Sequence, residues 1–527
     1  MTRDFHSPGR SPVYAGDGMA ATSHPLASLA AIETLRAGGN AADAAVAAVA
    51  LLGVLEPHMT GIGGDCFCLV AKPGQPVWGY NGSGRAGAAM RAEALIEQGL
   101  HAIAMDSVHA VTVPGAVEAW HAILTRHGRF GLDRALSHAI QAAERGVPVA
   151  PRVALDWSLA ADKLRAHEGA ALHFLRDGKT PAVGDVVKFP ALAATLKTIA
   201  KHGARAFYEG VIADDMVATA AARGSVLSAA DFTAHRGEDV IPISTNYRGL
   251  DVVEIPPNGQ GLAALVLLNI LDRFELSALD PTGADRFHLA LEAGRLAYAV
   301  RNAHIADSAA MRQSVSSLLY RAFAADLAGR IDRGKRSAFP PAPAPRGSTV
   351  LVCVVDRDRN AVTMINSLFS AFGSGIAAAK TGIMLHNRGW GFNLEPSHPN
   401  CIGPGKRPMH TIIPALALRD GRVDMSFGVM GGAYQAMGHA HFISNVVDYG
   451  MDVQTAIDLP RVFFEGEQTV VERGVSESAI GGLRERGHDV AVRPLPLGGG
   501  QAIGIDWERG VLIGGSDARK DGCALGY

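Results

Sequence analysis

The sequence predicts an α/β protein, with helices and sheets packed in layers (an α+β layered arrangement). An Ala-rich stretch over 41–55 is typical of a buried helix, and the apolar, β-branched stretch over 349–355 is typical of a buried strand. Of the 527 residues, 48% are hydrophobic, 61 are glycine and only 6% are aromatic. This composition supports a large core with many tight turns, nominally enough for about three domains.

Charge and the N-terminal sequence exclude several classes of protein. The net charge is −2 and the pI is about 6.9, so no basic excess favours nucleic acid or an anionic membrane surface as a partner. No apolar signal segment opens the chain, and the stretch over 41–55, interrupted by Asp43, is shorter than the roughly 20 residues of a membrane span. We therefore expect a cytoplasmic protein without membrane or nucleic-acid partners.

The cysteines are few, odd in number and without the spacing of a zinc site. We expect them to be reduced core thiols, as is usual in the cytoplasm. They are Cys66, Cys68, Cys353, Cys401 and Cys523.

The first 60 residues predict two helices. Ser23 can cap a helix over 26–35, which Gly38-Gly39 would end. Asn40 can cap the next helix, and Pro57 lies beyond its end.

The rest of the chain alternates between helical and strand patterns. The glycine loop over 61–65 leads into a strand over 66–71; its spacing is not GxGxxG and it precedes a strand, so a nucleotide-binding loop is not supported. The pattern is mostly helical over 117–339 and strand-like over 240–255, with later helices near 433–449 and 475–487.

The strongest internal boundary lies at residues 340–349. A proline-rich segment over 340–345 predicts a loop, and a buried strand begins at Thr349. Cleavage at Ser348–Thr349 would free an α-amine with a pKa of about 8, and this amine can deprotonate the hydroxyl of the same threonine. The boundary would then separate a large chain over 1–348 from a small chain over 349–527, intertwined in one domain. A threonine that merely opens a strand is the alternative.

The strand from Thr349 is predicted to form a hairpin with a strand over 361–368. If the polar turn is symmetric about Asp358, Thr349 faces Ser367 at about 5 Å between the two backbones. Ser367 would then be a hydrogen-bond partner for the hydroxyl or amine of Thr349. An ordinary cross-strand pair is the alternative.

Taken together, these motifs resemble the γ-glutamyltranspeptidase family of N-terminal-nucleophile hydrolases from about Ala20 to Tyr527. The matching stretches are Gly38–Ala44, Glu56–Gly64, Val113–Gly115, Thr349 with Val354–Asp358 and Asn360–Val362, Gly403–Pro408, Gly431–Gly432, and the closing Gly515–Asp517 to Gly526–Tyr527.

The resemblance implies an αββα four-layer sandwich of the N-terminal-nucleophile hydrolase type. It also implies that Thr349 is both the self-processing group and the nucleophile, and that the backbone amides of Gly431 and Gly432 hold the oxyanion of the tetrahedral intermediate. A family threonine matches Ser367. No cofactor is implied, and the partners would be a small amide substrate and the two chains of the precursor. The oligomeric state is left open, a homo-oligomer included.

The substrate-binding motifs depart from those of glutathione-cleaving members. Such members carry an Arg-Glu-x-Ala-Pro motif whose arginine binds the substrate α-carboxylate. In this chain, Arg85 lies about two residues after the position of that arginine. The Ser-Ser pair of the family becomes His410-Thr411, and an asparagine becomes Phe369.

The acidic motif that binds the substrate α-amine is also absent. Gly391 stands where the family keeps an acid, and Arg388 lies nearby. A buried ammonium without a carboxylate partner is costly, whereas arginine suits a carboxylate. These changes favour an anionic amide that lacks the γ-glutamyl amine, of oxamate or glutaryl type. A surface arginine without a ligand is the alternative for Arg388.

Three hypotheses therefore stand: a γ-glutamyl hydrolase or transpeptidase, an amidohydrolase or acylase acting on another anionic amide, and an uncleaved, inactive binding protein. No His-Glu-x-x-His motif supports a metal enzyme.

Overall fold

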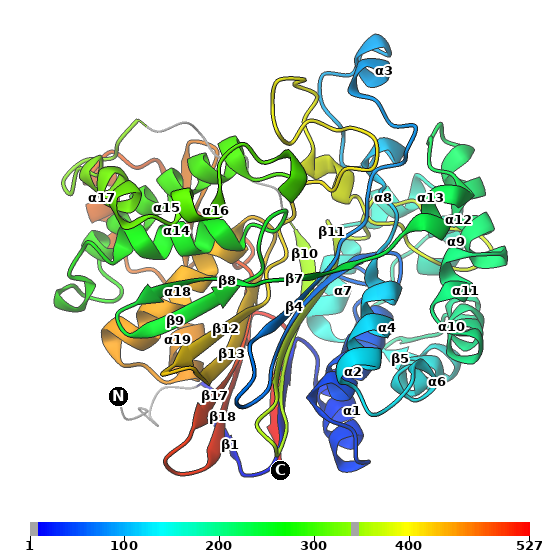
Figure 1. Cartoon of the computed structure of the whole chain (residues 1–527), viewed down its shortest axis with the longest axis horizontal. Helices are drawn as coiled ribbons and strands as arrows, with labels where there is room; N and C mark the ends of the chain where they lie inside the picture. The colour runs from blue at the N-terminus through cyan, green and yellow to red at the C-terminus, as the bar shows by residue number, and fades with distance from the viewer. Residues whose placement is uncertain (1–8, 339–346) are drawn as a thin grey trace.

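The computed structural model describes residues 9–338 and 347–527, so the proline-rich segment over 340–345 lies outside the described residues. Two seven-stranded antiparallel sheets face each other at the centre, and helices cover the outer face of each sheet (Figure 1). The predicted αββα sandwich is confirmed. No helix of these two described ranges is long and apolar enough to cross a membrane.

The first sheet has the order β19-β2-β10-β11-β3-β4-β7. Its strands are β2 (Met19–Thr22), β3 (Asp65–Ala71), β4 (Trp78–Gly82), β7 (Glu238–Val240), β10 (Ser348–Val355), β11 (Ala361–Phe369) and β19 (Cys523–Gly526). The strand that contains Thr349 is therefore central, as its apolar sequence predicts.

The second sheet has the order β1-β18-β17-β13-β12-β9-β8. Its strands are β1 (Val13–Ala15), β8 (Ile243–Tyr247), β9 (Leu250–Glu254), β12 (Ala415–Arg419), β13 (Arg422–Met430), β17 (Gly499–Asp506) and β18 (Val511–Ser516). Two small sheets join β5 (Val147–Pro148) to β6 (Val186–Val187), and β14 (Val462–Glu465), β15 (Gln468–Val471) and β16 (Val490–Val492) to one another. Both large sheets contain strands from each side of the Ser348–Thr349 bond.

Helix α2 packs on β10 and β11, and α18 packs on β13, so each central sheet has its own helical layer. The helices before Thr349 are α1 (Pro25–Arg36), α2 (Ala41–Leu55), α3 (Ala92–Glu97), α4 (Ala116–His127), α5 (Leu132–Ala135), α6 (Ser137–Arg145), α7 (Pro151–Ser158), α8 (Ala161–Arg165), α9 (Glu168–Phe174), α10 (Pro190–His202), α11 (Arg205–Tyr208), α12 (Val211–Ala221), α13 (Ala229–Ala234), α14 (Gly261–Leu271), α15 (Ala284–His304), α16 (Val315–Leu318) and α17 (Arg321–Gly329). After Thr349 come α18 (Tyr434–Tyr449), α19 (Val453–Asp458) and α20 (Glu477–Glu485). Short 3₁₀ helices are η1 (Val108–Ala110), η2 (Leu276–Ala278), η3 (Ser308–Ala310) and η4 (Arg388–Gly391).

The two N-terminal helices form where the sequence predicts, with one correction. Asn40 caps α2 through a capping box with Asp43, as expected. The prediction that Ser23 caps α1 is wrong: His24 is the capping residue, and its Nδ1 accepts from the backbone N–H of Leu26. The Ser23 hydroxyl donates to Glu56 instead.

The β10–β11 hairpin has the predicted register from Val350 onward, with Val350 opposite Asn366. A bulge between Ser348 and Val350 places Ser348 opposite Phe369, which has a φ of +77°. The bulge gives Thr349 a local geometry that a regular ladder does not have.

The two sheets are joined at their inner faces by both apolar and polar contacts. The Thr363 hydroxyl on β11 bonds to Ser426 on β13 at 2.7 Å and donates to the carbonyl of Ala415 at 2.8 Å. Gly428 on β13 leaves room for Leu351 of β10, since a Cβ there would come within 3.0 Å of the leucine side chain. Thr349 therefore belongs to a tightly packed centre.

Candidate active site

Thr349 is buried, with 1% of its surface exposed, beside the side chain that the sequence places opposite it. Its Oγ1 lies 3.0 Å from the Oγ of Ser367, which confirms the predicted contact. The Ser367 hydroxyl donates to the carbonyl of Ser348 at 2.8 Å and accepts from the N–H of Phe369 at 2.8 Å. The carbonyl of the Ser348–Thr349 bond is therefore polarised by a fixed donor next to the threonine hydroxyl.

The glycine pair at 431–432 lies against the same bond. It turns the chain from β13 into α18 with positive φ angles of +132° and +60°, a conformation that favours glycine. A Cβ on Gly347 would come within 2.3 Å of the Gly432 Cα, so the two backbones touch. The Gln260 amide donates to the carbonyl of Gly432 at 2.9 Å and accepts from Arg301 at 2.8 Å, which fixes the turn.

Arg388 is buried with 1% of its surface exposed, so the surface-arginine alternative is wrong. Its guanidinium donates to Thr411 Oγ1 at 2.8 Å and to Ser367 Oγ at 3.3 Å, and it lies 4.4 Å from the centre of the Phe369 ring. Arg388 thus connects the predicted Thr411 to the Thr349–Ser367 pair.

The positive charge of Arg388 has no direct counter-ion in the described part of the chain. Among residues 9–338 and 347–527, no carboxylate lies within ion-pairing distance of it, and its Nε has no hydrogen-bond partner. Burial lowers the pKa of this guanidinium to about 9, while the more distant Asp65 raises it. A buried cation in this state is suited to pairing with an anionic ligand.

Asp65 on β3 lies opposite Ser367 of β11 and accepts several buried hydrogen bonds. Its carboxylate accepts from His410 Nε2 at 3.0 Å and from the backbone N–H groups of Gly84 and Gly115. Burial by itself raises the pKa of Asp65, but His386 and His410 more than offset this and hold it well below its usual range. Burial, helped by the charge of Arg388, lowers the pKa of His410 to about 3, so this imidazole is neutral.

Arg85 does not join this group. Its guanidinium is partly exposed, lies 3.4 Å from Asp307 and 3.7 Å from Glu238, and donates to the carbonyl of Gly405 at 3.0 Å. These carboxylates already balance its charge, so the structure favours Arg388 over Arg85 as a carboxylate ligand.

Sequence reasoning did not find Asp65, His386 or Gln260. Each acts through contacts with segments more than 100 residues away, such as Asp65 with His410 and Gln260 with Gly432. The one signal for Asp65 is that an acid ends a glycine loop and starts a buried strand.

Comparison with known families decides the class of the protein. Residues 27–527 match the family described as gamma-glutamyltranspeptidase. The chain belongs to this family. It is therefore a member of an enzyme family of amide hydrolases and acylases.

Relatives within the γ-glutamyltranspeptidase family bear names of different activities. The chain is 38% identical to the glutathione hydrolase-like YwrD proenzyme of Bacillus subtilis over 96% of its own length and 98% of that protein. It is 35% identical to the oxamate amidohydrolase proenzyme of Klebsiella pneumoniae, over 97% and 98%. The crystal structure of cephalosporin acylase from Bacillus halodurans superposes with a TM-score of 0.93 at 38% identity, over 100% of this chain and 99% of that one.

This member of the γ-glutamyltranspeptidase family also has a cavity of about 130 Å³ beside the bond before Thr349. Gly347, Gly431 and Tyr434 line it together with the cationic side chains of Arg152 and Lys520. The cavity therefore borders both the glycine turn and the residue before the Ser348–Thr349 bond.

Proposed function

We propose that the chain is a proenzyme that cleaves itself at Ser348–Thr349 and then hydrolyses amides of dicarboxylic acids through Thr349. The acid would be of glutaryl or oxamate type, without the α-amine of a γ-glutamyl group. A γ-glutamyl hydrolase or transpeptidase is the second candidate, supported by the relatives named glutathione hydrolase.

The hydrogen bonds around Ser348 support self-cleavage. The Thr349 hydroxyl attacks the Ser348 carbonyl carbon; the new C–O bond forms, the C–N bond breaks, and the nitrogen takes up the hydroxyl proton. Ser367 donates to the carbonyl oxygen as its negative charge develops. Water then hydrolyses the ester, releasing the Ser348 carboxylate and a Thr349 with a free amine and hydroxyl.

The same groups support turnover. The freed α-amine takes the proton of the Thr349 hydroxyl, which attacks the substrate carbonyl, and the amine then returns the proton to the leaving nitrogen. Water hydrolyses the resulting ester in a second round. The amides of Gly431 and Gly432 are proposed to hold the oxyanion, with each donor contributing about 3–4 kcal/mol.

One observation carries the proposed specificity: the buried guanidinium of Arg388 hydrogen-bonds to the Ser367 hydroxyl, which in turn contacts the Thr349 hydroxyl. No carboxylate of the described residues pairs with this guanidinium. A substrate carboxylate placed on Arg388 would gain a charge-assisted pair close to the nucleophile. A substrate α-ammonium in the same place would face a buried like charge. The relatives named oxamate amidohydrolase and acylase fit this preference.

The test is a panel of the monoanilides of glutaric and oxalic acid, the γ-glutamyl anilide and the uncharged butyric anilide, all assayed with the processed enzyme. We expect kcat/KM to be highest for a dicarboxylic anilide and about 30-fold or more lower for the γ-glutamyl anilide. Efficient glutathione cleavage with poor use of the glutaric and oxalic monoanilides would instead support the second candidate.

A further inference from the structure

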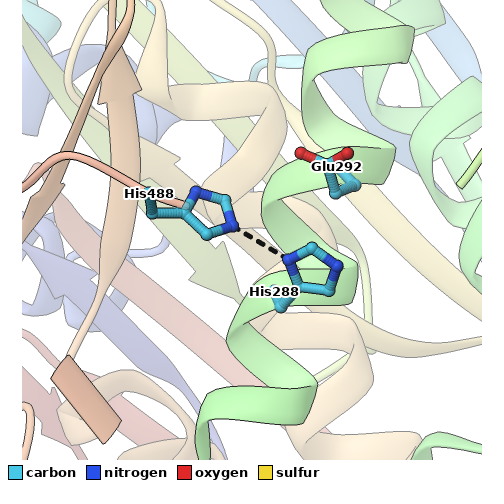
Figure 2. A group of neighbouring side chains, drawn as sticks. All are labelled: His288, Glu292 and His488. Atoms are coloured by element: carbon cyan, nitrogen blue, oxygen red, sulfur yellow. Dashed lines mark hydrogen bonds between the residues drawn. The ribbon is translucent and has the colours of Figure 1, made fainter. Parts of the chain in front are cut away.

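A second buried group of chemically active side chains lies away from Thr349. His288 and Glu292 project from the same face of α15, and His488 approaches them from the segment between α20 and β16 (Figure 2). All three are buried, with at most 3% of their surface exposed. Within the described ranges this is the one group of three or more His, Cys, Asp or Glu residues whose ligand atoms all lie within 4.8 Å of one another.

The two imidazoles face each other directly. His288 Nδ1 lies 2.9 Å from His488 Nε2 (Figure 2). Two protonated rings would oppose one N–H to another, so at least one of these nitrogens carries a lone pair. In the tautomer of His488 that carries its proton on Nδ1, this N–H can donate a hydrogen bond to the Thr469 hydroxyl, which lies 3.0 Å away. Both facing nitrogens can then act as ligands.

Two of these side chains are held by the backbone through the atom that would not bind the ion. His288 Nε2 lies 2.7 Å from the backbone carbonyl of Asp332, and Glu292 Oε2 accepts from the backbone N–H of Ser337 at 2.8 Å. Metal-bound histidines usually donate their second N–H to such a carbonyl or to a carboxylate.

Within the described part of the chain, the other carboxylate oxygen of Glu292 lacks a hydrogen-bond partner that would offset its burial. Glu292 Oε1 is buried and has no hydrogen-bond partner among the described residues. His288 and Glu292 are four residues apart on α15, a spacing that brings side chains to one helix face. An unsatisfied carboxylate oxygen beside two convergent imidazole nitrogens is costly unless a cation binds there.

We propose that His288, Glu292 and His488 bind one Zn²⁺ ion. Two imidazoles and a carboxylate are zinc ligands, and a water molecule can complete the tetrahedron. Ligand nitrogens about 2.0–2.1 Å from a tetrahedral ion are about 3.4 Å apart, so the observed 2.9 Å pair needs only a small opening and reorientation.

Three arginines surround the group, and each has an acidic partner. Arg295 and Arg336 both pair with Glu467, and Arg486 pairs with Asp285. Glu467 and Asp285 thus pair with all three guanidiniums, and neither of these acids is among the proposed ligands.

The ion would join the two sides of the proposed cleavage site. His288 and Glu292 lie before Thr349 and His488 lies after it, while Asp332 and Ser337 belong to the segment that leads toward residue 339. This linking role rests on the proposed cleavage, but binding of the ion does not.

The experiment measures zinc in tag-free protein that has been stripped with chelator, reloaded with Zn²⁺ and desalted. Wild type should retain one ion per chain pair. Glu292→Gln and His488→Ala should each weaken binding about tenfold or more. Glu467→Gln, which removes a neighbouring carboxylate that is not a ligand, is the matched control and should retain the ion. Co²⁺ loading adds a second readout, because visible absorption typical of a four-coordinate site should appear in wild type and Glu467→Gln and be absent from the two ligand variants.

Thr349→Ala separates this proposal from the proposed function. It should bind zinc as wild type does even if it stays uncleaved. Wild-type protein that retains no more zinc than Glu292→Gln would overturn the zinc site, as would equal Co²⁺ spectra in all variants. Loss of binding in Glu467→Gln alone would also overturn it.

Discussion

Replacing Arg388 by methionine should reduce the use of anionic amides far more than the use of uncharged ones. The substitution removes a buried charge that donates to Thr411 and Ser367, while keeping an unbranched side chain over the Phe369 ring. Hydrogen bonds to charged groups contribute about 1.5–3 kcal/mol, and truncating one side of a buried charge pair costs 2–5 kcal/mol or more. We take about 2–4 kcal/mol for a carboxylate held on Arg388, which corresponds to about 30- to 1,000-fold in kcat/KM.

The assay compares a glutaryl anilide with the uncharged butyryl anilide, so that effects on folding or on Thr349 cancel in the ratio. For the uncharged substrate we expect a change of less than about tenfold. Arg85→Ala is the matched control: its charge is already balanced by Asp307 and Glu238, so the ratio should stay near the wild-type value.

Stability gives an independent check of the same reasoning. A buried cation without a counter-ion is destabilising in the free enzyme, so Arg388→Met should unfold at the same or a higher temperature than wild type. Equal losses on both substrates in the variant, or a larger loss in Arg85→Ala, would refute the assignment of Arg388 as the carboxylate ligand.

Three further predictions concern Ser367, the glycine turn and pH. Ser367→Ala removes the donor to the Ser348 carbonyl and should slow self-cleavage about 100-fold or more, measured on gels over time, with a stability loss of only about 1–3 kcal/mol; cleavage at the wild-type rate would contradict its role. Gly431→Ala forces a Cβ to within 2.8 Å of the Gly498 Cα at a φ of +132°, so a folded variant should lose kcat about 100-fold; an unchanged kcat would exclude this turn from the oxyanion site. For both the glutaryl and the butyryl anilide, kcat/KM should rise as the Thr349 amine loses its proton near pH 8; a profile without this rise would argue against the amine as the base.

Local sequence signals predicted the elements that carry the proposed nucleophile. The proline segment followed by a β-branched run located Thr349 at the start of a central strand, and the turn about Asp358 gave the contact with Ser367. The bulge at Thr349 was not predictable, because it depends on the positive φ of Phe369 and on the bond from its N–H to Ser367.

The charge arrangement of the site was harder to predict than its strands. The sequence drew attention to both Arg85 and Arg388, but only the folded chain shows that Asp307 and Glu238 neutralise the first and that no carboxylate pairs with the second within the described residues. Asp65 was missed for the same reason, since its histidine partners, His386 and His410, come from distant segments. The Ser23 cap was wrong because a tertiary contact with Glu56 takes its hydroxyl.

The most direct test of the account is the mass and N-terminal sequence of the purified protein. We predict two chains, the smaller beginning Thr-Val-Leu-Val-Cys, and a single uncleaved chain for Thr349→Ala. A wild-type protein that stays at 55.1 kDa, or a Thr349→Ala protein that is still cut at this bond, would contradict the proposal that Thr349 is the self-processing nucleophile.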